Sequence, residues 1–139
     1  MVLQKRFLVL GAALFLIGLI TGLLPGVMSN PRMGLSAHMQ GLTNGMFLLA
    51  LGAAWSHVSL TPKWAEAAFW LLAFGTVANW LATSLAAFWG TGRMTPIISP
   101  DPTAAGWQEA LVSSLLLALT VAMLTGTIIV LAGFIRSKQ

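Results

Sequence analysis

The sequence predicts an all-α integral membrane protein, a single domain over residues 1–139 in which four transmembrane helices form a bundle with both termini in the cytoplasm. Three observations predict this fold. Hydrophobic residues make up 58% of the chain and charged residues only 7%, which would leave a soluble domain of this size with too little polar surface to cover itself. The apolar residues form four long stretches, and the prolines lie outside them or at their edges. Basic residues are concentrated on one side of the stretches.

The four stretches are each long enough to cross a bilayer as a helix. The first, residues 7–24, ends at a Pro-Gly pair, and its 18 residues would span roughly 27 Å. No small-residue cleavage site of the A-x-A kind follows it, so we expect it to be retained. The second, residues 37–55, is more polar at its start. The third and fourth cover residues 64–88 and 107–134.

The distribution of basic residues predicts the orientation in the membrane. Five of the seven lie on the side of the termini, namely Lys5, Arg6, Lys63, Arg136 and Lys138, and the other two, Arg32 and Arg93, lie on the opposite side. An excess of Lys and Arg marks the cytoplasmic side, so both termini should face the cytoplasm.

Glycine spacing predicts close helix packing. Gly18 and Gly22 form a GxxxG pair in the first stretch, and Gly41 and Gly45 form another in the second. Such pairs allow two helix backbones to approach closely, within or between protomers. Because so small a four-helix unit offers little interior volume for a ligand, we expect a homo-oligomer in which neighbouring helices help to form the site.

Composition excludes several classes of function. The chain has no cysteine, which rules out disulfides, thiolate nucleophiles and Cys-ligated zinc or iron–sulfur centres. Its basic residues are scattered, without the runs that bind nucleic acid. Any catalysis must therefore come from oxygen or imidazole groups, and the expected partners are the lipid bilayer and a small molecule.

Polar side chains gather toward the outer ends of the predicted spans. They are His38, Gln40, Asn44, Asn79, Thr83, Gln108 and Glu109. Polar groups at membrane depth are costly unless they pair or face a wet cavity, so each is a functional candidate. His57 and Glu66 lie near the opposite ends, roughly 28 Å from His38 in the case of His57, and we expect them to be solvated.

Each candidate also has a structural interpretation. Asn79 and Thr83 are suited to hydrogen bonds between membrane helices. Glu109 is close to the start of the fourth stretch, where a carboxylate is stabilised by the helix dipole. His38 is also compatible with an interfacial histidine that has no role in chemistry.

Several segments together resemble the bacterial hydroxylaminobenzene mutase family. They are the run NPRMGLSAH at residues 30–38, then Gly41, Asn44 and Gly45, the run GTVANWLAT at residues 75–83, and Trp107-Gln108-Glu109. The resemblance covers nearly the whole chain. It implies a small isomerase of the bacterial inner (cytoplasmic) membrane that converts hydroxylaminobenzene to 2-aminophenol in nitroaromatic degradation.

That reaction resembles an acid-assisted Bamberger rearrangement, which needs no redox cofactor. It requires a proton donor at the N–OH oxygen, a base that restores aromaticity, and a site that limits escape of a cation to bulk water. Desolvation near the membrane surface favours the protonated form of a carboxyl group, so Glu109 is the expected acid. His38 is the expected base or second donor.

The remaining candidates would bind the substrate. Asn44 and Asn79 would hold the hydroxylamine by hydrogen bonds, with further contacts from Thr83 and Gln108. The rings of Trp80 and Trp107 would stack on the arene and stabilise the developing cation, although tryptophans at span ends also serve as interfacial anchors. Arg32 would orient a polar substrate group or pair at the surface.

Two alternatives remain open. A divalent metal ion held by His38 and Glu109 could polarise the N–OH oxygen in place of an acid, but two strong ligands are few for a tight site. A non-catalytic transport or channel subunit would use the same outer polar cluster to bind or gate a small solute.

Overall fold

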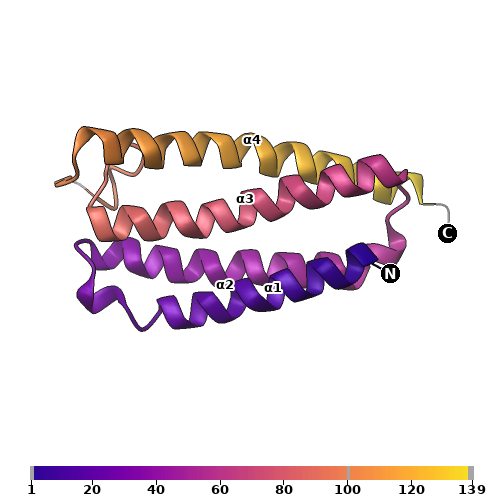
Figure 1. Ribbon diagram of the computed structural model, residues 1–139, viewed down its shortest axis with the longest axis horizontal. Coiled ribbons are helices and arrows are strands. Elements are labelled where there is room, and N and C mark those ends of the chain that lie inside the picture. Colours follow the sequence, from indigo (N-terminus) through magenta and orange to yellow (C-terminus); the bar gives the residue numbers. More distant parts are fainter. Residues whose placement is uncertain (1, 100, 138–139) are drawn as a thin grey trace.

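The computed structural model describes residues 2–99 and 101–137 as four long helices arranged side by side (Figure 1). They are α1 (Val2–Thr21), α2 (Pro31–Ala54), α3 (Pro62–Trp89) and α4 (Gly106–Arg136), with short 3-10 turns at η1 (Pro25–Val27) and η2 (Trp55–His57). The described residues contain no strand, which confirms the all-α class. The N- and C-terminal ends lie at the same end of the array (Figure 1).

Three of the four helices, α1, α3 and α4, are long and apolar enough to cross a membrane. The other helix, α2, has 24 residues, which is sufficient length, but it is less apolar than its neighbours. Its polar residues are accommodated because α2 packs between α1 and α3. Burial of polar groups between helices explains why the second stretch is the least hydrophobic in the sequence.

Helix α2 begins at Pro31, earlier than the sequence pattern indicated. The side chain of Asn30 caps it, since Asn30 Oδ1 accepts a hydrogen bond of 3.1 Å from the backbone N–H of Met33. Pro31 at the first helical position is preorganised for this start. His38 is therefore well inside a regular helix, and its direction is fixed by the helical period.

The packing order of the helices is α1 on α2, α2 on α3 and α3 on α4, with a smaller contact between α1 and α3. Helix α4 is supported mainly by α3, as the edge position of α4 in Figure 1 shows. Its outer apolar side chains, Leu117, Val121, Leu124 and Ile128, are each more than half exposed. Helix α4 is thus the edge helix of the array, although Val130 of α4 shares a buried cluster with residues of the other three helices.

The backbones of α1 and α2 touch at their glycines. A Cβ atom added to Gly18 would lie 2.7 Å from the carbonyl carbon of Gly41, and one added to Gly11 would lie 2.9 Å from the carbonyl oxygen of Gly45. These are backbone atoms that cannot move aside. The glycine pairs therefore serve helix packing within one chain, as their spacing predicted.

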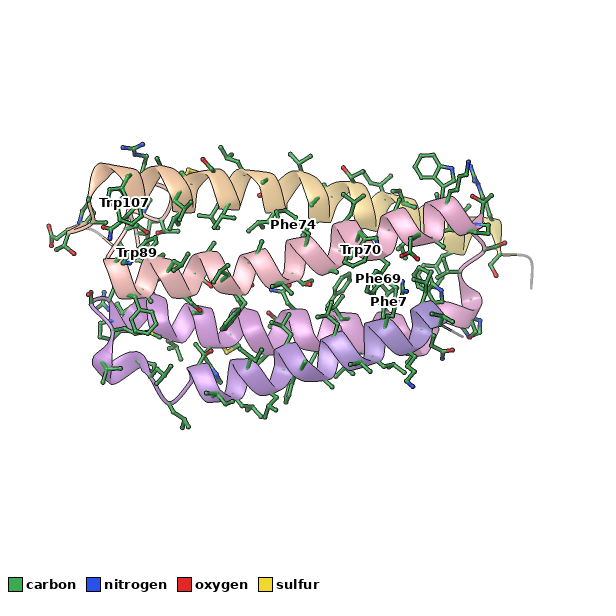
Figure 2. All side chains as sticks on the ribbon, viewed as in Figure 1. Phe7, Phe69, Trp70, Phe74, Trp89 and Trp107 are labelled. Carbon is green, nitrogen blue, oxygen red and sulfur yellow. The ribbon has the colours of Figure 1, made fainter. Side chains whose placement is uncertain are left out.

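Aromatic side chains pack together at the end of the array where α1 and α3 begin. Phe7 is fully buried, and its ring makes an edge contact with Phe69 at a centroid distance of 5.0 Å. Arg6 and Glu66 form an ion pair of 2.9 Å on the surface beside them. A groove of about 670 Å³ adjoins this region between α1 and α3, and Figure 2 shows Trp70 there, at the end opposite to Trp89.

Candidate functional site

Three amide side chains form a hydrogen-bonded cluster between α2 and α3. The Oε1 atom of Gln40 accepts a hydrogen bond of 2.9 Å from Asn79 Nδ2 and one of 3.3 Å from Asn44 Nδ2. Asn44 is buried, whereas Gln40 and Asn79 are partly buried. Gln40 thus connects a neighbour one turn away on α2 with a residue of α3.

His38 faces α1, on a different side of α2 from this amide cluster. Its Nδ1 atom lies 2.7 Å from the carbonyl oxygen of Gly18. Because a carbonyl oxygen can only accept, Nδ1 carries the hydrogen, and Nε2 of the neutral ring keeps a lone pair. A Cβ atom on Gly22 would lie 2.6 Å from Nδ1, so glycine is required there to make room for the ring.

Trp80 joins α3 to α1 close to His38. Its Nε1–H donates a hydrogen bond of 3.0 Å to Thr21 Oγ1, and a Cβ atom added to Gly41 would lie 3.2 Å from Trp80 Cδ1. Gly41 itself touches Gly18, whose carbonyl binds His38. His38 and Trp80 are therefore near the same level of the array.

We call the side chains at this level the polar layer, which comprises Thr21, His38, Gln40, Asn44, Asn79 and Trp80. Thr83 is one turn further along α3, and its hydroxyl donates to the carbonyl of Asn79 at 2.8 Å, within its own helix. The polar layer therefore draws on α1, α2 and α3.

Glu109 lies elsewhere, in the first turn of α4 against the loop that follows α3. Its Oε1 accepts a hydrogen bond of 2.7 Å from the backbone N–H of Gly92, and its Oε2 accepts one of 3.1 Å from that of Arg93. The residue is only 8% exposed. Since both oxygens accept, this is the geometry of a carboxylate that holds a loop, which supports the structural interpretation of Glu109.

The neighbours of Glu109 also have structural contacts. Gln108 Oε1 accepts a hydrogen bond of 2.8 Å from the backbone N–H of Ala105 and so caps α4. Trp107 is 63% exposed and packs edge-on against Trp89 at a centroid distance of 5.2 Å (Figure 2). Trp89 follows Trp80 by roughly 14 Å along α3, so Trp107 and Trp80 are at different levels.

Arg32 is exposed in the first turn of α2. It lines a cavity of about 400 Å³ together with Ser29, Asn30, Pro31, Gly90, Ile98, Ser99, Asp101 and Thr103. The Asn30 side chain spans this region, because its Nδ2 donates to Ser99 Oγ at 2.6 Å. Arg32 is thus in the wall of this cavity and not in the polar layer.

Comparison with known proteins places the chain in a family. The family model described as styrene oxide isomerase matches residues 3–135. This chain belongs to the styrene oxide isomerase family.

Two curated relatives of the isomerase come from Ectopseudomonas oleovorans. Hydroxylaminobenzene mutase HabB is 50% identical over 132 residues, which is 94% of this chain and 80% of that protein. Hydroxylaminobenzene mutase HabA is 44% identical over 135 residues, which is 96% of this chain and 100% of that protein. No solved structure matches. The family resemblance and the prediction of an isomerase are confirmed.

The structure brings together only part of the predicted site of the isomerase. His38, Asn44, Asn79 and Trp80 are in or beside one layer, whereas Arg32, Trp107, Gln108 and Glu109 are near the end of the array where α2 and α4 begin. The expectation that His38 and Glu109 meet in one chamber is not met within a single chain, because His38 faces α1 and α4 packs against α3. The described residues also contain no group of three or more His, Asp or Glu side chains that could hold a metal ion.

The sequence marked Gln40 as a general functional candidate without a specific role, and it did not mark Thr21, although both make central hydrogen bonds in the polar layer. The spacing of Gln40 and Asn44 by four residues was the available signal for the first. Thr21 gave no comparable signal, since its partner Trp80 is far away in the sequence.

Proposed function

We propose that this isomerase is a membrane mutase that converts arylhydroxylamines of the hydroxylaminobenzene type to 2-aminophenols. The similarity to two proteins named hydroxylaminobenzene mutase, over nearly the whole chain, carries the proposal. The polar layer supports it, because it supplies an imidazole, an indole ring and amide groups in otherwise apolar surroundings.

In this proposal the amides bind the hydroxylamine and His38 moves the protons. The protonated ring of His38 gives a proton to the N–OH oxygen, and the N–O bond breaks with positive charge on the nitrogen and the ring. The leaving water adds to the ortho carbon and gives one proton back to His38 Nε2, and the proton on that ring carbon then moves by way of the same imidazole to the nitrogen, which becomes the amine. No atom or electron is gained or lost overall, so the reaction is an isomerisation.

Other groups around the polar layer stabilise and protect the cation. The ring face of Trp80 stabilises positive charge on the substrate. Packing of α1 on α2 partly buries the ring of His38, which limits capture of the cation by solvent. Glu109, with both oxygens bonded to loop N–H groups, holds the loop between α3 and α4 in this scheme.

A product assay tests the proposal. Protein purified in detergent is incubated with hydroxylaminobenzene without nicotinamide or flavin, with and without a chelator, and the products are separated by chromatography. We expect 2-aminophenol in both arms. No product in either arm would refute the proposed function, whereas product lost only with chelator would assign the acid role to a metal ion.

We further propose that α2 also spans the membrane, so that the chain crosses the bacterial inner membrane four times with both termini in the cytoplasm. The absence of cysteine allows a direct test. Met94→Cys, in the exposed outer loop, should react with an impermeant maleimide in intact spheroplasts, and Ser56→Cys, in the exposed turn η2, only after permeabilisation. The opposite labelling pattern would show that the termini face away from the cytoplasm.

A homo-oligomer also forms part of the proposal. Helix α4 has one packed side and a long exposed apolar side, which leaves room for a neighbouring chain. Light scattering with detergent correction should give a mass of two or more chains. A monomer with full activity would show that a neighbouring chain contributes nothing to the site.

A further inference from the structure

Gln40 is the common acceptor of the polar layer. Its single Oε1 atom receives the Nδ2 groups of Asn79 and Asn44, at 2.9 and 3.3 Å. Because the side-chain amide is planar, a bond that holds Nδ2 of an asparagine also restricts the position of its Oδ1. Gln40 therefore restricts where both carbonyl oxygens can point.

These carbonyl oxygens have no hydrogen-bond partner among the residues that the structure describes. Within residues 2–99 and 101–137, no group donates to Asn44 Oδ1 or Asn79 Oδ1, and none accepts from Gln40 Nε2. Among the described residues, Ser113 Oγ is the one fully enclosed side-chain atom that lacks a hydrogen-bond partner. The unpartnered atoms of Asn44, Asn79 and Gln40 are therefore not fully enclosed. Two acceptors and one donor thus remain open to a ligand.

Amide groups at membrane depth are costly when their hydrogen bonds are incomplete. A cluster that only fastened α2 to α3 would need one donor and one acceptor. Here a third amide, Asn44, is oriented by the same oxygen although it is on the same helix as Gln40, so its bond adds nothing to the joining of the helices. The arrangement orients two acceptors instead.

We propose that Gln40 is a positioning residue that aims the Oδ1 atoms of Asn44 and Asn79 at the N–H and O–H donors of the arylhydroxylamine. This inference rests on the proposed function. Two donors on adjacent substrate atoms match two carbonyl acceptors held by one side chain. Gln40 acts through the asparagines, so its loss misplaces the substrate more than it weakens binding of the apolar ring.

The test compares three variants with the wild-type protein in the product assay. Gln40→Met keeps the length of the side chain but removes the acceptor, and kcat should fall roughly 10- to 100-fold while KM changes less than about threefold. Gln40→Glu keeps an acceptor oxygen and should restore kcat to within about threefold. Thr43→Val is the control, since Thr43 is exposed on α2 and bonds only to its own helix; its kcat should not change.

A double-mutant cycle adds a readout that a purely structural role would not move. If Gln40 acts through Asn79, then Gln40→Met should lower kcat much less in an Asn79→Leu background than in the wild type. Additive losses would overturn the inference, as would wild-type kcat in Gln40→Met or no rescue by Gln40→Glu. If Gln40→Met does not fold, Gln40→Asn, one methylene shorter, takes its place with the same expected results.

The two proposals fail differently. Wild-type protein that forms no 2-aminophenol would overturn the proposed function and this inference together. Active wild-type protein with an equally active Gln40→Met variant would overturn the inference alone.

Discussion

The carboxylate of Glu109 accepts a hydrogen bond of 2.7 Å from the backbone N–H of Gly92, which ties the first turn of α4 to the loop after α3. Its other oxygen binds the N–H of Arg93 at 3.1 Å. A side chain used in this way stabilises the end of the molecule where α3 passes into α4. Because of this geometry, we expect mutation of Glu109 to remove a contact with the loop, and not to remove the catalytic acid.

Glu109→Gln should therefore lower stability and leave turnover measurable. The variant keeps one acceptor oxygen but presents an NH₂ group to a backbone N–H, so we expect a loss of roughly 1.5–3 kcal/mol. The melting temperature in detergent and kcat would be measured together. Abolished turnover at an unchanged melting temperature would instead restore Glu109 as the proton donor.

Gly41→Ala should destabilise the packing of α1 on α2, because the new methyl group would overlap the backbone at Gly18. We expect a loss of about 1–3 kcal/mol, measured as a lower melting temperature. Gly106→Ala is the matched control, since nothing lies within 4 Å of a Cβ atom there. Equal melting temperatures for the two variants would contradict the close contact.

His38→Gln should lower kcat by roughly 100- to 10,000-fold, the range expected when a general acid–base group is removed. Glutamine can still donate to the carbonyl of Gly18, so the fold should be retained. His57→Gln, at an exposed position in η2, is the control and should keep wild-type kcat. A His38→Gln variant with normal turnover would exclude the imidazole from the chemistry.

Trp80 can act through its ring face and through its hydrogen bond to Thr21, and three variants separate these two contributions. Trp80→Phe keeps a ring and should retain most turnover, whereas Trp80→Leu should lose about 2- to 30-fold, as expected for a cation–π contact of about 0.5–2 kcal/mol. Thr21→Val removes only the hydrogen bond to Nε1 and should cost about 0.6 kcal/mol of stability. Equal turnover in the Phe and Leu variants would show that the ring face is not used.

The candidate site was only partly predictable. Asn79 and His38 were found because polar groups in apolar stretches are rare, and this signal needs no knowledge of neighbours. The helical period places His38 about 120° from Asn44 when both residues lie in one regular helix. The start at Pro31 satisfies that condition: His38 bonds to α1, whereas Asn44 bonds to Gln40, which also accepts from Asn79 on α3.

The sequence by itself determined the four apolar segments, the helical class and the collection of polar residues toward one end, because composition and periodicity act locally along the chain, and the resemblance of its motifs indicated the family. Only the tertiary structure decided which of those residues share a site. The direction of a side chain changes by 100° per residue, and its partner depends on which helix lies across from it. For that reason Gln40 acquired two amide partners, while Glu109 was turned toward the backbone of a loop.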